Sequence, residues 1–155
     1  MCLILFRFRP QTAEPLLVAA NRDEFHQRAS APAQFWEDEP LILAGKDLVA
    51  GGTWLGCSRQ GRFAALTNFT QGEPATFPKS RGELVYGFLS GTQSVKDYAL
   101  SIKGDQYAGF NLLLFDGARL LYTTNVCPPD QPRSRLLPAG DYGLSNACRL
   151  YTSDA

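Results

Sequence analysis

The chain has 155 residues, of which 45% are hydrophobic and 19% are charged, a composition typical of one globular domain with a buried core. Fifteen basic residues balance fifteen acidic ones, so the formal net charge is zero. A neutral chain gives no electrostatic footprint for nucleic acid, so we expect no nucleic-acid partner. The sequence shows no export signal and no apolar run near the ~18 residues of a membrane span, which predicts a cytoplasmic protein.

The first two dozen residues predict an antiparallel hairpin. Two apolar runs, residues 2–8 and 16–22, read as strands, and Pro10 ends the first of them. The pairing returns the end of the second strand to the start of the first. Cys2 is therefore expected beside the tetrad Asn21-Arg22-Asp23-Glu24.

Cys2 is a candidate nucleophile. Removal of Met1 would leave a thiol and a free amine on one residue, and both groups titrate near neutral pH in ordinary peptides. The amine can then act as general base for the thiol, which attacks an acyl carbon, while Arg22 favours the thiolate and Asp23 orients the amine or Arg22. The alternative is a small apolar residue beside a structural ion pair.

The other chemistry-bearing side chains give weaker signals. The four cysteines are too widely spaced for a zinc or redox motif, so we expect reduced thiols and no metal site; they are Cys2, Cys57, Cys127 and Cys148. His26 is the only histidine. It is a candidate ligand-binding residue, although a lone histidine beside a polar tetrad is more often a hydrogen-bonded surface residue.

Residues 25–40 contain Pro32 and Pro40 and no clear period, which predicts a long irregular segment. Phe35 and Trp36 either fold this segment over the site as a lid or anchor it to the core.

The run Gly51-Gly52-Thr53-Trp54-Leu55-Gly56 predicts a close backbone approach. Trp54 then lies either in the core behind a tight turn or against a ligand. Residues 62–69 read as a strand that ends at Asn68. Asn68 or Asn111 could donate a hydrogen bond to an oxyanion, and either could instead cap a turn.

Two helix starts follow. Ser80-Arg81-Gly82-Glu83 has the form of a capping box, with Gly91 at the end of its helix. The run 94–97 repeats the pattern, and that helix ends before Gly104. Both helices are expected to cover one face of a sheet. Arg81 is either a ligand for an anionic group or a solvated surface residue.

A second hairpin is predicted at residues 107–115 and 119–124, joined by the turn Asp116-Gly117. The continuous apolar run within 110–115 indicates a strand buried on both faces. Residues 127–140, rich in proline, read as loop, and residues 142–146 as the beginning of another strand.

Several of these segments together resemble the NRDE family. They are Met-Cys before an apolar strand, Asn-Arg-Asp-Glu at 21–24, Gly-Gly-Thr-Trp-Leu-Gly at 51–56, Thr-Asn-Phe at 67–69, Ser-Arg-Gly-Glu-Leu-Val at 80–85, Gly-Phe-Asn-Leu at 109–112 and Gly-Leu-Ser-Asn-Ala at 143–147. The resemblance implies an α+β, N-terminal-nucleophile-hydrolase-like αββα sandwich of two antiparallel sheets between helices. Amidohydrolases of that fold also begin Met-Cys, and Cys2, Arg22 and Asp23 match their positions, although a shared fold is not a shared reaction.

The resemblance also implies intracellular handling of a hydrophobic metabolite. We therefore expect a carrier that binds haem or a lipid-like molecule as cargo near Cys2 and requires no cofactor. The alternative is an N-terminal cysteine hydrolase of small amides with Cys2, Arg22, Asp23 and Asn68 or Asn111 in its site. Further candidate ligand-binding residues are Asn21, Glu24, His26, Trp54 and Arg81. Residues 148–155 depart from the family pattern, so we expect residues 1–155 to be a single domain truncated at its C-terminus.

Overall fold

The computed structural model describes residues 2–69, 76–146 and 150–152, so Met1 and Cys148 lie outside the described residues. The elements in chain order are β1 (Leu3–Phe8), β2 (Leu16–Asn21), β3 (Ser30–Phe35), β4 (Ile42–Asp47), β5 (Leu55–Ser58), β6 (Phe63–Asn68), α1 (Gly82–Ser90), α2 (Val95–Ser101), the 3-10 turn η1 (Gly104–Gln106), β7 (Phe110–Phe115), β8 (Leu120–Thr124), β9 (Ser134–Leu136), β10 (Gly140–Ser145) and β11 (Leu150–Thr152). Every strand pairing is antiparallel, which confirms the predicted α+β class.

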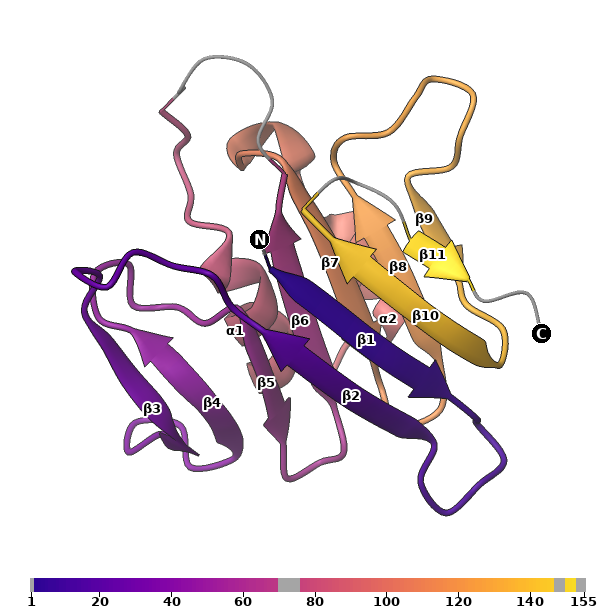
Figure 1. Cartoon of the computed structure of the whole chain (residues 1–155), viewed down its shortest axis with the longest axis horizontal. Coiled ribbons are helices and arrows are strands. Elements are labelled where there is room, and N and C mark those ends of the chain that lie inside the picture. The colour runs from indigo at the N-terminus through magenta and orange to yellow at the C-terminus, as the bar shows by residue number, and fades with distance from the viewer. Residues whose placement is uncertain (1, 70–75, 147–149, 153–155) are drawn as a thin grey trace.

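The strands form two sheets stacked face to face (Figure 1). The smaller sheet has four strands in the order β11-β10-β1-β2, and the larger has seven in the order β3-β4-β5-β6-β7-β8-β9. In Figure 1 the smaller sheet crosses in front of the larger one, and the helices lie behind. The order of layers is therefore sheet, sheet, helices.

Two hydrophobic cores follow from this layering. One lies between the sheets and is built from alternate residues of β1, such as Ile4 and Phe6, against Leu113 and Tyr122 of the larger sheet. The other lies between the larger sheet and the helices and includes Phe88 of α1. All six residues of β7 are buried because its two faces serve both cores, as the continuous apolar run predicted.

The predicted hairpins are confirmed. β1 and β2 pair with Leu3 opposite Asn21, so the residues that follow β2 return to the start of the chain. β7 and β8 are joined through Asp116-Gly117, where Gly117 has a φ of +96°, a conformation that favours glycine. The strand predicted at 142–146 is β10.

The prediction that residues 25–40 are irregular is wrong for β3. This strand lies at the edge of the larger sheet, and five of its six residues are exposed, so it carries no apolar period. Its register against β4 shifts between Ala31 and Gln34, which places Pro32 at the bulge, where a missing N–H breaks no regular ladder. Trp36 is 4% exposed and lies in the helix-side core, which supports the anchoring alternative over the lid.

The prediction that residues 127–140 are loop is wrong for β9, an edge strand of the larger sheet. β9 has only three residues and two of them are exposed, so hydrophobic alternation could not reveal it.

The predicted start of α2 is confirmed, and that of α1 is confirmed only in part. Ser94 accepts a hydrogen bond from the Asp97 amide, as the capping pattern predicts. At α1, Glu83 accepts a hydrogen bond from the Ser80 amide at 3.4 Å, but the prediction that Ser80 caps the helix is wrong. The helix begins at Gly82, one residue later than predicted, and its N-cap is Arg81, whose side chain makes no capping bond.

No helix among the described residues covers the outer face of the smaller sheet. Leu5 and Leu17 are 50% and 59% exposed there. The helical layer expected on that side is therefore not observed within residues 2–69, 76–146 and 150–152. Across the same described ranges, no helix has the length and apolar character needed to cross a membrane.

Candidate functional site

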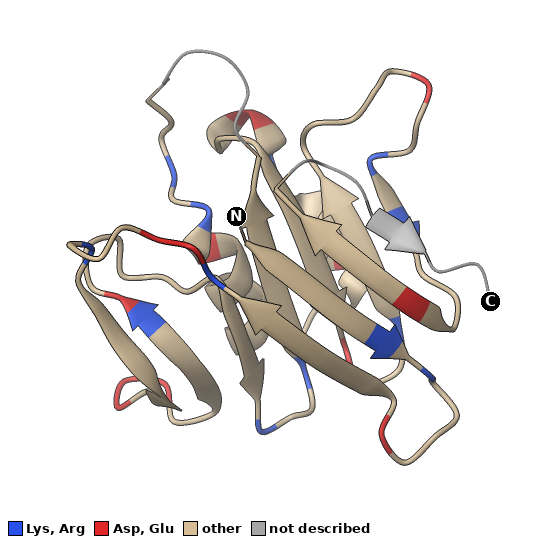
Figure 2. Ribbon diagram, in the orientation of Figure 1, with Lys and Arg blue, Asp and Glu red and all other residues tan. Residues whose placement is uncertain are grey.

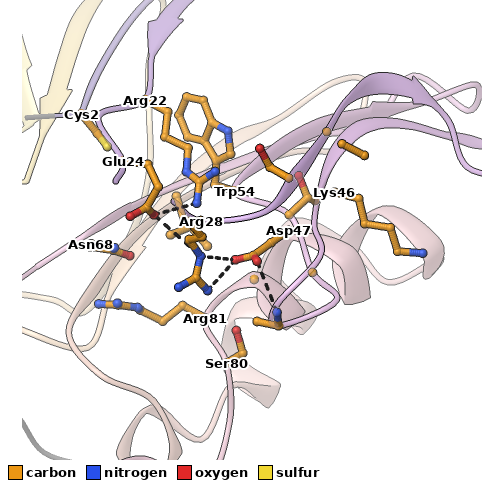
Figure 3. A pocket seen from close by; sticks show the side chains of 18 of the residues that line it. Cys2, Arg22, Glu24, Arg28, Lys46, Asp47, Trp54, Asn68, Ser80 and Arg81 are labelled. Atoms are coloured by element: carbon orange, nitrogen blue, oxygen red, sulfur yellow. Dashed lines mark hydrogen bonds and ion pairs between the residues drawn. The ribbon is translucent and has the colours of Figure 1, made fainter. Parts of the chain in front are cut away.

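A pocket of about 470 Å³ opens at the end of the sandwich where β1 begins and β2 ends. Its walls come from the segment after β2, the end of β4 and the turn to β5, the end of β6, and the residues before α1 (Figure 3). Seven of the ten residues predicted for a site line it: Cys2, Arg22, Asp23, Glu24, Trp54, Asn68 and Arg81.

Cys2 sits in this pocket with its thiol against the backbone of Asp23. The Asp23 amide donates to Sγ at 3.4 Å, and Sγ lies 3.8 Å from the Asp23 carbonyl oxygen. The backbone nitrogen of Cys2 donates to Oδ1 of Asn146 at 2.8 Å. The hairpin register thus gives the predicted proximity, and it does so through the main chain of Asp23.

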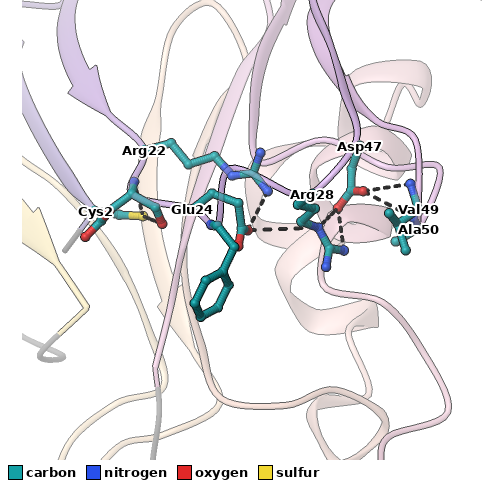
Figure 4. A network of polar contacts seen from close by, with 9 residues as sticks. Cys2, Arg22, Glu24, Arg28, Asp47, Val49 and Ala50 are labelled. Carbon is teal, nitrogen blue, oxygen red and sulfur yellow. Dashed lines mark hydrogen bonds and ion pairs between the residues drawn. The ribbon is translucent and has the colours of Figure 1, made fainter.

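The charged side chains form a chain of ion pairs leading away from Cys2 (Figure 4). Arg22 does not reach back to the thiol, because its Nη2 donates to Glu24 Oε2 at 2.8 Å. Arg28 follows, with Nε 3.9 Å from the same Glu24 oxygen and Nη2 2.7 Å from Asp47 Oδ2. The segment after β2 is thereby fastened to the end of β4.

Asp47 is the most heavily bonded carboxylate of this network. Its Oδ1 accepts from the amides of Val49 and Ala50 at 2.9 and 3.3 Å, while Arg28 occupies Oδ2. Burial raises the pKa of Asp47, but the hydrogen bonds from Arg28 and the two amides outweigh it and leave the pKa below its usual value. Asp47 therefore stays ionised and holds the turn of residues 47–51.

The turn packs directly against the start of α1 through two glycines. A Cβ on Gly52 would lie 2.7 Å from the carbonyl carbon of Gly82, so the two backbones touch with no side chain between them. This contact is the close approach that the paired glycines predicted. Trp54 follows in the chain, is half-buried, packs against both cores and also lines the pocket.

Arg81 approaches the pocket from the other side. Its Nη1 donates to the carbonyl oxygen of Gly109 at 3.0 Å. Burial, and then the charge of nearby Arg28, lower the pKa of Arg81. In the view of Figure 3 its side chain extends toward Asn68, whose side chain has no hydrogen bond to another described residue.

Three predicted residues lie outside the lining. Asn111 is fully buried in β7, where its amide donates to Thr67 Oγ1 at 3.2 Å and to the Ser145 carbonyl at 3.4 Å, while Tyr122 donates to its Oδ1 at 2.7 Å. Its hydrogen bonds therefore join the two sheets. His26 and Asn21 are exposed and do not line the pocket.

Four functional candidates were missed by sequence reasoning. Arg28, Lys46 and Asp47 line the pocket, and Asn146 binds the Cys2 nitrogen. Arg28 and Asp47 are 19 residues apart, and no local sequence pattern predicts their pairing. Asn146 lies within segment 143–147, which resembles the family, and this resemblance was the signal that could have identified it.

The pocket combines a thiol, paired and unpaired guanidinium groups and apolar surface. No group of three or more His, Cys, Asp or Glu side chains in the described ranges could hold a metal ion. The arrangement suits recognition of an organic molecule with a polar end, and it places a thiol where such a molecule would lie.

Comparison with known proteins identifies the family. The family described as Transport and Golgi organisation 2 (TANGO2) matches residues 1–152. The human Transport and Golgi organization protein 2 homolog is 42% identical over 161 aligned positions, covering 95% of this chain and 57% of the human protein. The mouse homolog is 40% identical over the same coverage, and the Drosophila melanogaster protein is 32% identical over 83% of this chain and 52% of its own length.

The chain therefore spans little more than half the length of these relatives. Its match to the family runs through the described site, from Cys2 and the tetrad at 21–24 to Asn146. On these matches, the chain belongs to the TANGO2 family.

Proposed function

We propose that the chain binds and passes on a hydrophobic metabolite, haem before other lipid-like molecules, in the pocket beside Cys2. The observation that carries the proposal is the pocket itself, about 470 Å³ in volume, in which the Cys2 thiol shares a space with the apolar side chains of Phe25, Trp54 and Leu66. A thiolate is one of the side-chain groups that ligate haem iron. The names of the relatives speak of transport, which agrees with a carrier.

The proposal includes the fold and the setting. The two stacked antiparallel sheets and the cysteine at the start of β1 support an N-terminal-nucleophile-hydrolase-like sandwich. A cytoplasmic location belongs to the same proposal, and imaging of the tagged chain tests it.

Titration with haem tests the carrier function. Cys2→Ala removes the thiol from the pocket and should weaken the saturable change in the haem absorption spectrum. His26→Ala is the matched control, because His26 is exposed and does not line the pocket, so this variant should bind haem like the starting protein. Absence of a saturable change in the starting protein would refute the proposal. An equal loss of haem affinity in both variants would show that haem does not bind specifically beside Cys2.

A second candidate is an N-terminal cysteine hydrolase of small amides. The specific observation in its favour is that the Cys2 nitrogen and sulfur both have fixed partners, Asn146 Oδ1 at 2.8 Å and the Asp23 amide at 3.4 Å. If Met1 is removed, that nitrogen becomes the amine that can take the thiol proton, and the Asn68 amide in the same pocket could bind an oxyanion.

Intact mass separates the two candidates. Retention of Met1 blocks the amine and eliminates the hydrolase mechanism. Removal of Met1, together with rapid alkylation of Cys2 at neutral pH and slow alkylation after unfolding of the pocket, supports it. Haem binding with Met1 retained supports the carrier alone.

A further inference from the structure

The cations of the pocket differ in how they are neutralised. Arg22 has Glu24 at 2.8 Å, Arg28 has Asp47 at 2.7 Å, and Lys46 has Asp38 at 3.1 Å. Arg81 is the exception, because no carboxylate within the described residues forms an ion pair with it. One guanidinium in the lining therefore has a positive charge that no carboxylate in residues 2–69, 76–146 or 150–152 pairs with.

The surroundings of Arg81 make that charge costly. The side chain is half-buried, and one N–H is fixed on the Gly109 carbonyl, which carries no charge. Burial and the nearby Arg28 both lower the pKa of Arg81, so an anion bound beside this guanidinium would be stabilising. The other N–H groups of the guanidinium remain for a ligand, since this group carries five donors in a fixed plane.

Neutral donors lie in the same lining. Asn68 at the end of β6 and Ser80 ahead of α1 both border the pocket with Arg81. An amide, a hydroxyl and a guanidinium together match the two oxygens of a carboxylate, for which arginine is the preferred planar partner. A phosphate dianion fits less well, because Asp23, Glu24 and Asp47 line the same pocket and would repel its second charge.

We propose that Arg81 anchors a carboxylate of the bound metabolite, so that the apolar body of the ligand lies in the remainder of the pocket with Trp54 and Cys2. The ligand class is then an apolar acid. This inference rests on the proposed carrier function and names the chemistry that its pocket selects.

Protoporphyrin IX and its dimethyl ester give the direct test, because they share one ring system and differ in charge. The starting protein should bind the free acid at least tenfold more tightly than the ester. Arg81→Gln should weaken binding of the acid roughly tenfold to a hundredfold, the usual range for loss of a charged hydrogen bond, and leave the ester unchanged. Arg81→Lys keeps the positive charge but loses the planar arrangement of donors, so its affinity for the acid should lie between that of the starting protein and that of Arg81→Gln.

The matched control is Arg59→Gln. Arg59 also donates to a backbone carbonyl, that of Pro40 at 3.4 Å, but it does not line the pocket. This variant should bind both porphyrins like the starting protein. Thermal melting of each variant without ligand shows whether Arg81→Gln is folded, and the unchanged ester affinity provides the same check on the pocket.

Three results would overturn the inference. The first is equal binding of acid and ester by the starting protein, and the second is an Arg81→Gln variant that binds the acid normally. The third is inorganic phosphate displacing the acid at lower concentration than acetate does. If neither porphyrin binds, palmitate and hexadecanol repeat the comparison; equal binding of that pair, or binding of neither, then overturns the carboxylate site. The titration with haem described above decides separately whether the chain carries haem, because these porphyrins contain no iron for Cys2 to ligate.

Discussion

The backbone nitrogen of Asp23 donates a hydrogen bond to the Cys2 sulfur at 3.4 Å, across the open end of the first hairpin. Because Asn21 stands opposite Leu3 in the register, two further residues along the chain bring the Asp23 amide to the thiol. The contact requires an acceptor at position 2, and it does not require a particular side chain at position 23.

Substitutions of Cys2 should separate the contribution of this hydrogen bond from that of packing of the sulfur. Serine keeps an acceptor for the Asp23 amide and a donor toward the Asp23 carbonyl, so Cys2→Ser should retain stability to within about 1 kcal/mol. Cys2→Ala leaves that amide without its partner, and the free energy of unfolding should fall by about 1–2 kcal/mol. Urea unfolding measures both. Equal losses would show that packing of the sulfur, and not the hydrogen bond, holds this end of the hairpin.

The Arg28–Asp47 ion pair predicts a pH-dependent contribution to stability. Asp47→Asn should lower the free energy of unfolding at pH 7 by about 1–2 kcal/mol, because a charge-assisted bond between two segments is lost. The pKa of Asp47 is lowered in the folded chain, so its contribution is complete above its unfolded value of about 3.9 and disappears as the pH falls through the folded value. The difference between the two proteins should therefore begin to narrow below about pH 4 and close once the pH is below the folded pKa of Asp47.

Asp38→Asn is the control for this experiment. It makes the same chemical change in an exposed ion pair with Lys46, and such pairs contribute little to stability. We expect no measurable difference from the starting protein at any pH. A similar loss in both variants would mean that general charge, not the Arg28 contact, explains the effect.

The contact between Gly52 and Gly82 predicts a steric effect. Gly52→Ala would force a Cβ to within 2.7 Å of backbone that cannot rotate away, and overpacking of this kind costs about 1–3 kcal/mol. Gly143→Ala is the comparison, since its Cβ would meet only the end of Leu5 at 3.4 Å. Thermal melting should rank Gly52→Ala well below Gly143→Ala, and identical melting would contradict the backbone contact.

The buried contacts of Arg62, which lies outside the pocket, predict that its substitution lowers the free energy of unfolding. It is 7% exposed, donates from Nε to the Phe88 carbonyl at 3.0 Å and from Nη2 to the Gln93 carbonyl at 2.8 Å, and lies over the Phe88 ring. Lysine cannot reproduce the two separated bonds, so Arg62→Lys should lower the free energy of unfolding by about 1–3 kcal/mol. Arg59→Lys, on the exposed side of the same turn, should have little effect in the same denaturation assay.

Local chemistry made part of this fold predictable. The turn at Asp116-Gly117 and the cap at Ser94 are decided by residues within four positions of one another, and both stand where the sequence indicated. The predicted closeness of Cys2 and Asp23 also followed from one hairpin. These features need no knowledge of the rest of the chain.

Contacts between distant segments could not be predicted in this way. β3 has no apolar period because it is an exposed edge strand with a bulge, and it pairs only when β4 is in place. The bond of Asn111 to Ser145 spans 34 residues and two sheets, so a sequence pattern could not tell this buried asparagine from one in a site. Arg28 and Asp47 meet for the same reason, through tertiary structure alone.

The close approach of Gly52 and Gly82 also bears on selectivity. Gly52 and Gly82 both line the pocket, and neither has a side chain that could change rotamer to fit a ligand. A ligand with a bulky branch facing this wall would be excluded by shape, whereas a flat or slender one would slide past. Any adaptation of the pocket to the shape of a ligand would then have to come from side chains elsewhere in its lining.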